Sequence, residues 1–300
     1  MSDGQIVISG LTKVYGKVRA VDDLSFTVDP GRVTGFLGPN GAGKTTTLRM
    51  LLNLVTPTAG TATIGGRRYA DLAEPSRTVG AVLEASSAHK GRSGRNHLRI
   101  VSAAAGLPDS RVDEVLALTG LTPAAKRKFK GYSLGMRQRL GICAAMLGDP
   151  QVLILDEPAN GLDPQGIRWL RDFLRTLAAE GRAILVSSHV LAEVSQTADD
   201  VVVINKGRSV AQSSLTEMIA RAGGGMKISG PDTAKLRDLL VADGAEVTGD
   251  ADLFVRNRSG EEIGRVIAAN QIVVSELASV GSSLEQVFFE LTDSGQGGPS

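Results

Sequence analysis

The sequence predicts an α/β protein with an antiparallel β subdomain and a helical subdomain, followed by a small α+β domain. Three observations lead to this prediction. A glycine-rich segment joins an apolar run to a helical pattern, and two further apolar runs end in polar residues before helical segments. The C-terminal part follows the order β-α-β-β-α-β. Strands that alternate with helices in the larger part are typical of a parallel sheet covered by helices.

Length and composition restrict the class of protein. The 300 residues and 42% hydrophobic content suffice for packed cores in two domains. The formal net charge of +1 gives no electrostatic reason to expect nucleic acid as a partner. The single cysteine, Cys143, excludes an internal disulfide framework and favours a reducing compartment. Residues 1–10 lack a basic region followed by an apolar core, so we expect no secretory signal. No stretch approaches about twenty apolar residues, so we expect no membrane-spanning helix.

The glycine-rich segment fits the phosphate-binding pattern G-x-x-x-x-G-K-[ST] and lies between a predicted strand, Arg32–Leu37, and a predicted helix, Thr46–Leu52. Backbone N–H groups and the positive end of the helix are expected to hold phosphate. Lys44 would reach the β- and γ-phosphates, and the Thr45 hydroxyl would bind Mg²⁺. The alternative is a strand-to-helix turn without a ligand. The expected ATP-binding residues in this segment are Gly38, Pro39, Asn40, Gly41, Ala42, Gly43, Lys44, Thr45 and Thr46.

The N-terminal segment predicts two strands, Gln5–Leu11 and Ala20–Val28, joined by a connection that contains Tyr15. Tyr15 is either a platform for an adenine ring or an ordinary packing residue. After the helix, strands are expected at 61–64 and 78–83, and the second of these ends at Glu84.

Residues 85–149 have a mostly helical pattern. Their first part, His89–Arg99, is basic and is either a contact surface or a solvated segment. A helix is predicted over Gln138–Leu147, and Ser133 with Gly135 before it is either an anion site or a simple helix N-cap.

The apolar run Val152–Leu155 ends in Asp156 and Glu157, which a parallel sheet would bring to its ligand-binding edge. Asp156 suits Mg²⁺, and Glu157 suits the base that deprotonates the attacking water. Asp163-Pro164 predicts the start of a helix over 165–180. The next buried strand, 183–189, ends at His189, which either senses a γ-phosphate or satisfies local backbone. A hairpin is expected around residues 205–207.

Residues 223–225 are three glycines and form the expected interdomain linker. They would divide a domain at 1–222 from an accessory domain at 226–293, followed by a disordered tail at 294–300. The accessory domain predicts a split βαβ, ferredoxin-like module with strands at 226–229, 246–248, 253–256 and 272–277 and helices at 233–243, 261–270 and 283–291.

The order of these motifs resembles the ATP-binding subunit of an ABC transporter over roughly residues 5–220. The resemblance implies a P-loop NTPase fold, ATP and Mg²⁺ as cofactors, ATP hydrolysis, and two ATPs buried in a head-to-tail homodimer. Tyr15 matches the aromatic loop, Glu157 the catalytic glutamate, and His189 the switch histidine. Asp163 lies in the D-loop. Ser133, Leu134, Gly135 and Met136 take the place of the signature that contacts the ATP of the opposite subunit.

Two positions depart from the family pattern. Glu84 stands at the Q-loop in place of the usual glutamine, where it would bind Mg²⁺ or a water. Leu134 and Met136 replace a glycine and a glutamine of the signature, so we expect weaker contacts to the nucleotide across the dimer.

The single nucleotide-binding domain with its small tail resembles the subset that serves ABC-2-type drug and antibiotic exporters. This resemblance implies an ATPase at the cytoplasmic side of the membrane, attached through a separate permease that exports a drug, antibiotic or other small amphipathic compound. The alternatives are a soluble ABC-type ATPase without a membrane partner and a regulatory nucleotide-binding subunit without useful turnover.

Overall fold

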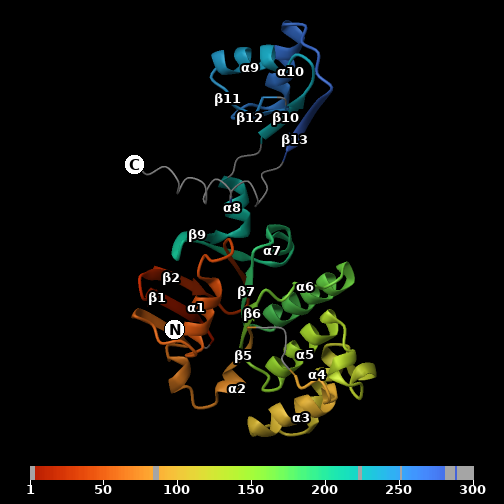
Figure 1. The fold of residues 1–300 in the computed structure, drawn as a ribbon. Coiled ribbons are helices and arrows are strands. Elements are labelled where there is room, and N and C mark those ends of the chain that lie inside the picture. The colour runs from red at the N-terminus through yellow and green to blue at the C-terminus, as the bar shows by residue number, and fades with distance from the viewer. Residues whose placement is uncertain (1–3, 84–87, 222–224, 251, 281–287, 289–300) are drawn as a thin grey trace. The chain divides into compact units, whose positions relative to one another are not determined.

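The computed structural model describes residues 4–83, 88–221, 225–250, 252–280 and 288. The chain divides into two compact units, residues 1–214 and 215–300, and each is considered separately (Figure 1). The division falls before the predicted linker at 223–225. Gly223 and Gly224 lie outside the described residues, and Gly225 begins a strand.

The centre of the first unit is a sheet with the strand order β5-β6-β7-β3-β8-β9. β5, β6, β7, β3 and β8 are parallel, and β9 pairs antiparallel with β8. The strands are β3 (Val33–Leu37), β5 (Val79–Val82), β6 (Val152–Asp156), β7 (Ala183–Ser188), β8 (Asp200–Asn205) and β9 (Arg208–Ser214). Lys206 and Gly207 join the last two strands with positive φ angles of 48° and 81°, as a type I′ hairpin turn requires.

The two faces of this sheet belong to two separate cores. Leu153 and Leu155 of β6 belong to one cluster, whereas Val152 and Ile154 belong to the other. This alternation buries the strands on both faces, which is why their sequences are continuous apolar runs.

A three-stranded antiparallel sheet and helix α1 (Lys44–Leu51) contribute to the core on one face. The sheet has the order β2-β1-β4, formed by β1 (Ile6–Tyr15), β2 (Val18–Val28) and β4 (Ala59–Ile64). Tyr15 therefore ends a strand that is longer than predicted.

Helices cover the other face, on the side of the sheet away from β1 and β2 (Figure 1). They include α3 (Gly94–Ala104), α4 (Ser110–Leu118), α5 (Leu134–Met146) and α6 (Pro164–Ala179). The shorter helices are α2 (Pro75–Thr78) and α7 (Leu191–Thr197), and single 3₁₀ turns lie at 69–71, 122–124 and 129–131. Within the described residues, no helix is long and apolar enough to span a membrane.

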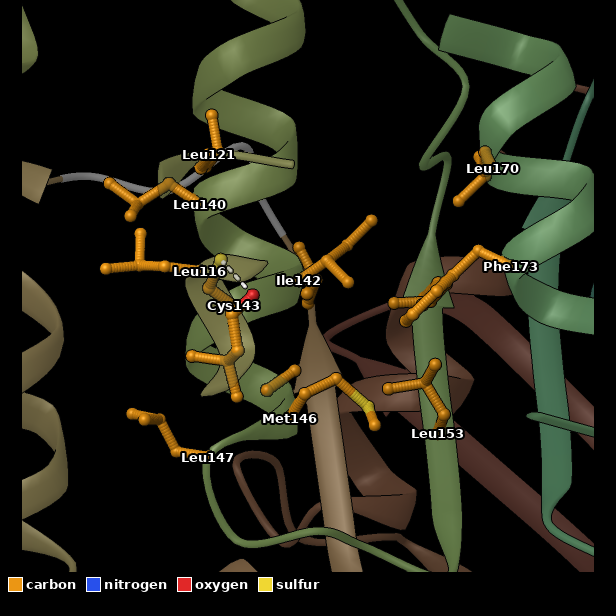
Figure 2. Packing of buried hydrophobic residues seen from close by; sticks show 14 of the residues in the cluster. Leu116, Leu121, Leu140, Ile142, Cys143, Met146, Leu147, Leu153, Leu170 and Phe173 are labelled. Carbon is orange, nitrogen blue, oxygen red and sulfur yellow. Dashed lines mark hydrogen bonds between the residues drawn. The ribbon is translucent and has the colours of Figure 1, made fainter. Parts of the chain in front are cut away.

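Figure 2 shows how α5 and α6 pack over β6, with Met146 and Phe173 directed toward Leu153. Cys143 lies in the same core and is 2.9 Å from the Thr119 hydroxyl. Burial raises the pKa of its thiol to about 12, so Cys143 is an inert packing residue.

The second unit begins with α8 (Leu215–Arg221) and contains a sheet of the order β11-β12-β10-β13. Its elements are β10 (Gly225–Ser229), α9 (Thr233–Ala242), β11 (Glu246–Thr248), β12 (Asp252–Arg256), α10 (Gly260–Ala269) and β13 (Glu276–Val280). The order along the chain and the antiparallel pairing are those of the predicted ferredoxin-like module.

The prediction of a strand starting at Ile272 is wrong, because Ile272 belongs to the motif that follows and terminates α10. Its N–H donates to the Ile267 carbonyl at 3.1 Å, and Gln271 before it has a φ of 50°, which together form a helix-ending motif. The Ile272 side chain is buried in the small core, and the strand starts at Glu276. The predicted helix at 283–291 and tail at 294–300 lie outside the described residues, apart from Phe288.

Candidate nucleotide-binding site

The phosphate loop connects β3, in the middle of the sheet, to α1. Gly43 is the N-cap of α1 with a φ of 104°, a left-handed conformation that favours glycine. A Cβ atom at this position would lie 2.6 Å from the Ala20 carbonyl oxygen, so β2 also excludes a side chain there. The backbone thus approaches the site without a side chain in between.

The N-terminus of α1 is suited to an anion. Its first N–H groups have no intrahelical acceptor by helix geometry, and Gly43 supplies no side-chain cap. No acidic residue lies in the first turn. Helix α1 begins at Lys44, two residues before the predicted start, so Lys44 and Thr45 both belong to this turn.

Lys44 is only 7% exposed and lies among acceptors. Its Nζ donates to the Gly38 carbonyl at 2.7 Å and to the Pro39 carbonyl at 3.4 Å. It also lies 3.5 Å from Oε1 of Glu157 at the end of β6. A buried ammonium group needs such partners, and the oxygens of a phosphate have the same chemistry.

A chain of hydrogen bonds joins the loop to the sheet edge. The Thr45 hydroxyl donates to Oδ2 of Asp156 at 2.7 Å. The hydroxyl of the fully buried Ser187, on β7, donates to the other oxygen of the same carboxylate. Thr45 and Asp156 thus place a hydroxyl and a carboxylate oxygen side by side. Hard oxygen donors of this kind fit Mg²⁺, which takes its other ligands from phosphate and water.

Glu157 has a φ of 49°, which is uncommon for a residue with a side chain and typical of strained positions at functional sites. Ser187 holds this conformation, because the Glu157 N–H donates to the Ser187 carbonyl at 3.2 Å and to its hydroxyl at 3.0 Å. Oε2 of Glu157 lies 2.8 Å from Nδ1 of His189, which follows β7 directly. The Glu157 carboxylate therefore lies between Lys44 and His189.

Two residues of this site were not predicted from the sequence. Ser187 contacts both acids at the end of β6. Glu193, on α7, is a second carboxyl group near Glu157 and His189. Burial raises the pKa of Glu193 and the charge of Glu157 adds to the increase, whereas His189 and a hydrogen bond with Ser188 oppose it. The pair Ser187-Ser188 directly before His189 is the feature of the sequence that could have indicated Ser187.

Tyr15 lies at the end of β1, where it pairs with Val18 of β2. It is 48% exposed, and Nζ of Lys13 lies 4.9 Å from its ring centroid. Ala20 of β2 touches the phosphate loop at Gly43, so Tyr15 is a few residues away along the same hairpin. Glu84 lies outside the described residues.

The remaining predicted residues meet in a second hollow. Ser133 is the N-cap of α5, which begins four residues before its predicted start, and its hydroxyl accepts from the Met136 N–H at 3.2 Å. Asp163 is the N-cap of α6 and accepts from the Gly166 N–H at 2.7 Å. The hollow is lined by Ser133, Leu134, Gly135, Met136, Arg139, Gly161, Leu162, Asp163 and Gly166.

Leu134 and Gly161 fit together in this second hollow. A Cβ atom on Gly161 would lie 2.0 Å from Cδ2 of Leu134, and Gly161 has a φ of 74°. The leucine that departs from the family pattern thus occupies the space over the D-loop glycine.

The two hollows share no residue among the described parts of the chain. The first is lined by Pro39 through Thr46 together with Glu157. Within one chain, the phosphate loop therefore lies beside Asp156, Glu157 and His189, and Ser133 lies beside Asp163. These two groups of residues do not meet in one hollow.

Comparison with known proteins identifies relatives that match nearly the whole chain. A family profile described as "ABC transporter" matches residues 21–160, and one described as "Domain of unknown function (DUF8746)" matches residues 224–285. The uncharacterized ABC transporter ATP-binding protein YhcH of Bacillus subtilis (strain 168) is 38% identical over 297 residues, or 95% of each chain.

The bacitracin transport ATP-binding protein BcrA of Bacillus licheniformis is 36% identical over 97% of this chain and 98% of its own. Among solved structures, an ATP-binding subunit of an ABC transporter has a TM-score of 0.65 and 29% identity. The match covers 72% of this chain and 92% of that one.

Proposed function

Because this chain belongs to the family of ABC transporter ATP-binding proteins and is an ABC-type ATPase, we propose that two copies of it bind and hydrolyse ATP to drive a separate membrane permease. The observation that carries the proposal is the continuous set of contacts from Thr45 through Asp156 and Ser187 to Glu157 and His189. It joins a phosphate-binding loop to a group that deprotonates water.

In this proposal the phosphates of ATP bind the N–H groups at the start of α1 and Nζ of Lys44. Tyr15 stacks on the adenine. Thr45 and Asp156 hold Mg²⁺, which neutralises phosphate charge when bound, and Glu84 is a further proposed ligand. Lys44, now bonded to the Gly38 and Pro39 carbonyls, transfers its hydrogen bonds to phosphate oxygens.

Glu157 accepts the proton of the attacking water, a role usually worth about 10²–10⁴ in rate. Its left-handed backbone, held by Ser187, fixes the carboxylate beside the loop, and His189 orients it through the 2.8 Å contact. A preset geometry of this kind needs no rearrangement when the water reacts.

The second hollow supports a head-to-tail dimer. Ser133 and the N-terminus of α5 have the same chemistry as the first anion site but lie in a different hollow of the same chain. A second copy would bring its Ser133 and Asp163 to the first copy's ATP. Leu134 and Met136 offer no side-chain amide to the nucleotide, so this contact would be weakened.

BcrA is named for bacitracin transport, and it matches this chain nearly end to end. We therefore assign the chain to export of an antibiotic or a similar amphipathic compound through an ABC-2-type permease, with the ATPase bound at the cytoplasmic side of the membrane. Copurification from detergent-solubilised cells tests this assignment. A membrane protein with several spans supports it, whereas ribosomes or duplex DNA would contradict it.

The test of the catalytic assignment is Glu157→Gln in the full chain. Removal of the base should lower Mg²⁺-dependent phosphate release by at least about 100-fold while ATP binding persists. Glu180→Gln, at the exposed end of α6, is a matched control that should leave the rate unchanged. Hydrolysis by Glu157→Gln at the unmodified rate would show that another group activates the water.

A further inference from the structure

The phosphate loop is bonded to the turn between β8 and β9. The Gly207 N–H of this turn donates to the Ala42 carbonyl at 3.0 Å. The hollow of the loop is lined by residues 39–46 and Glu157, so the Ala42 carbonyl points out of the hollow toward the turn. Because the C=O and N–H of a trans peptide point in opposite directions, the Gly43 N–H points away from the turn, toward the hollow.

Strand β2 holds the same turn from the other side. The Asp22 N–H donates to the Gly207 carbonyl at 2.9 Å. A Cβ atom on Gly207 would lie 3.0 Å from both the Ala20 carbonyl oxygen and the Cα of Val21, so the backbones of the turn and of β2 are in close contact. Gly207 thus donates its N–H to the phosphate loop, accepts from β2 with its carbonyl, and connects the two.

The Asp22 side chain adds a second connection between β2 and this hairpin. Its Oδ1 accepts from Nη1 of Arg19 at 2.6 Å, and its Oδ2 accepts from Nε of Arg208 at 2.8 Å. Asp22 is 9% exposed, whereas the side chains of Arg19 and Arg208 are 58% and 67% exposed. The hydrogen bond from Arg19 lowers the pKa of Asp22 most, burial opposes the shift, and Arg208 lowers the pKa further. We call Arg19, Asp22 and Arg208 the Asp22 cluster.

A β-bulge places Asp22 at this position. Asp22 and Asp23 on β2 together lie opposite the single residue Thr12 of β1. Asp23 has a φ of 51°, and its N–H donates to the Thr12 hydroxyl at 3.1 Å. Bulges re-aim a side chain and interrupt the regular ladder, and here the Asp22 N–H is free to bond the Gly207 carbonyl. The irregularity of β2 therefore serves the contact with the turn.

We propose that Asp22 is a positioning residue that holds the phosphate loop in its phosphate-binding conformation, acting through Arg208 and Gly207. The inference rests on the proposed function, because it concerns the loop that binds ATP there. Exposed ion pairs contribute little to stability, but this cluster lies one residue from the turn that fixes the peptide between Ala42 and Gly43. ATP then meets a loop that is already formed, which favours its binding.

The experiment compares Asp22→Asn with the unmodified full chain, using calorimetric titration with Mg·ATP and steady-state phosphate release. The variant keeps the shape of the side chain but leaves both arginines without a carboxylate. A hydrogen bond to a charged group is worth about a tenfold factor, so ATP affinity should fall about tenfold. The value of kcat at saturating ATP should stay nearly unchanged, because the bound phosphates then order the loop.

Arg208→Gln tests the same contact from an exposed side chain whose loss leaves the core intact. It should weaken ATP binding in the same direction, and it carries the test if Asp22→Asn does not fold. The effects of the two substitutions should not add in the double variant, because they remove one interaction.

The matched control is Asp200→Asn. Asp200 begins β8 and pairs with Arg32, which directly precedes β3, so this ion pair lies at the opposite end of these strands from the phosphate loop. Its loss should leave ATP affinity unchanged. Mg·tripolyphosphate, which carries three phosphates without adenine, is the second probe. Its inhibition constant against ATP hydrolysis should rise in Asp22→Asn by the same factor as the dissociation constant of ATP.

The proposal is overturned if Asp22→Asn and Arg208→Gln bind ATP as tightly as Asp200→Asn does. It is also overturned if Asp22→Asn loses affinity for ATP but not for tripolyphosphate, because the cluster would then act on the adenine through the β1–β2 hairpin. Lys44→Ala separates these failures from failure of the proposed function. Normal ATP binding by Lys44→Ala would contradict the proposed ATP site itself, whereas lost binding there with normal binding in Asp22→Asn contradicts only the role of Asp22.

Discussion

Three polar side chains beside the phosphate loop, those of Lys44, Asp156 and Ser187, are buried, whereas Leu134 in the Ser133 hollow is 47% exposed. Lys44 and Asp156 are each 7% exposed, Ser187 is fully buried, and each has a hydrogen-bond partner in the same chain. Ser133 and Asp163 make only the local bonds of helix N-caps. The comparison teaches that the contacts among Lys44, Asp156 and Ser187 form within one chain, whereas the Ser133 hollow is the surface that we propose a second copy covers.

Ser187→Ala is the most direct test of the buried contacts beside the phosphate loop, because the proposed site assigns Ser187 no contact with ATP. The variant loses the donor to Asp156 and the hydroxyl acceptor of the Glu157 N–H. Loss of a group that orients ligands typically costs about 10–100-fold, so kcat should fall by that factor with little change in ATP affinity.

Ser187→Thr keeps the hydroxyl and should restore most of the activity, while Ser188→Ala alters the neighbouring serine as a control. Steady-state phosphate release at several ATP concentrations separates kcat from KM. A normal kcat in Ser187→Ala would mean that the buried contacts are structural only.

Met136→Gln tests the exposed Ser133 hollow. It restores the amide of the family signature at the start of α5, and one or two added hydrogen bonds contribute about 0.5–1.5 kcal/mol each. The ATP-bound dimer should therefore become several-fold to about tenfold more stable, as measured by analytical ultracentrifugation. Met136→Leu adds no amide and should show no gain, so equal dimerisation of the two variants would contradict this prediction.

Glu193→Gln should have the smallest effect, on stability rather than turnover. Folding raises the pKa of Glu193 above its ordinary value of 4.5, so the folded chain keeps a proton that the unfolded chain releases. The free energy of unfolding therefore decreases as pH rises from the ordinary toward the raised pKa.

The glutamine variant removes this titration. Its Tm should match that of the unmodified chain below about pH 4. At pH values above the raised pKa of Glu193, its Tm should exceed that of the unmodified chain by a few degrees. Exposed Glu74→Gln controls for the change in net charge. A constant difference in Tm at all pH values would show that Glu193 does not titrate on unfolding.

Burial also explains which features of the site could be predicted from the sequence and which could not. Val152–Leu155 and Ala183–Val186 were recognisable because strands buried on both faces are continuous apolar runs. The acids and the histidine at their ends were therefore placed correctly on one edge of the sheet. Ser187 was missed because its role arises from contact between neighbouring strands, which no spacing along the chain reveals.

The limits of prediction in the second unit have a similar cause. An apolar Ile272 after a helix reads equally as a strand start or as a helix-ending contact. Only the hydrogen bond to Ile267 and the packing in the small core decide between them. In the first unit, helix α7 was missed because its seven residues are too few for a clear period.

The most direct test of the central claim, that two chains complete each ATP site, is the oligomeric state of Glu157→Gln in ATP, measured by light scattering. Bound ATP that is not hydrolysed should convert the variant from monomer to dimer. Addition of Ser133→Arg, which blocks the start of α5 with a bulky side chain, should keep it monomeric with ATP still bound. A Glu157→Gln chain that stays monomeric at saturating ATP, or a double variant that dimerises as well, would contradict the account.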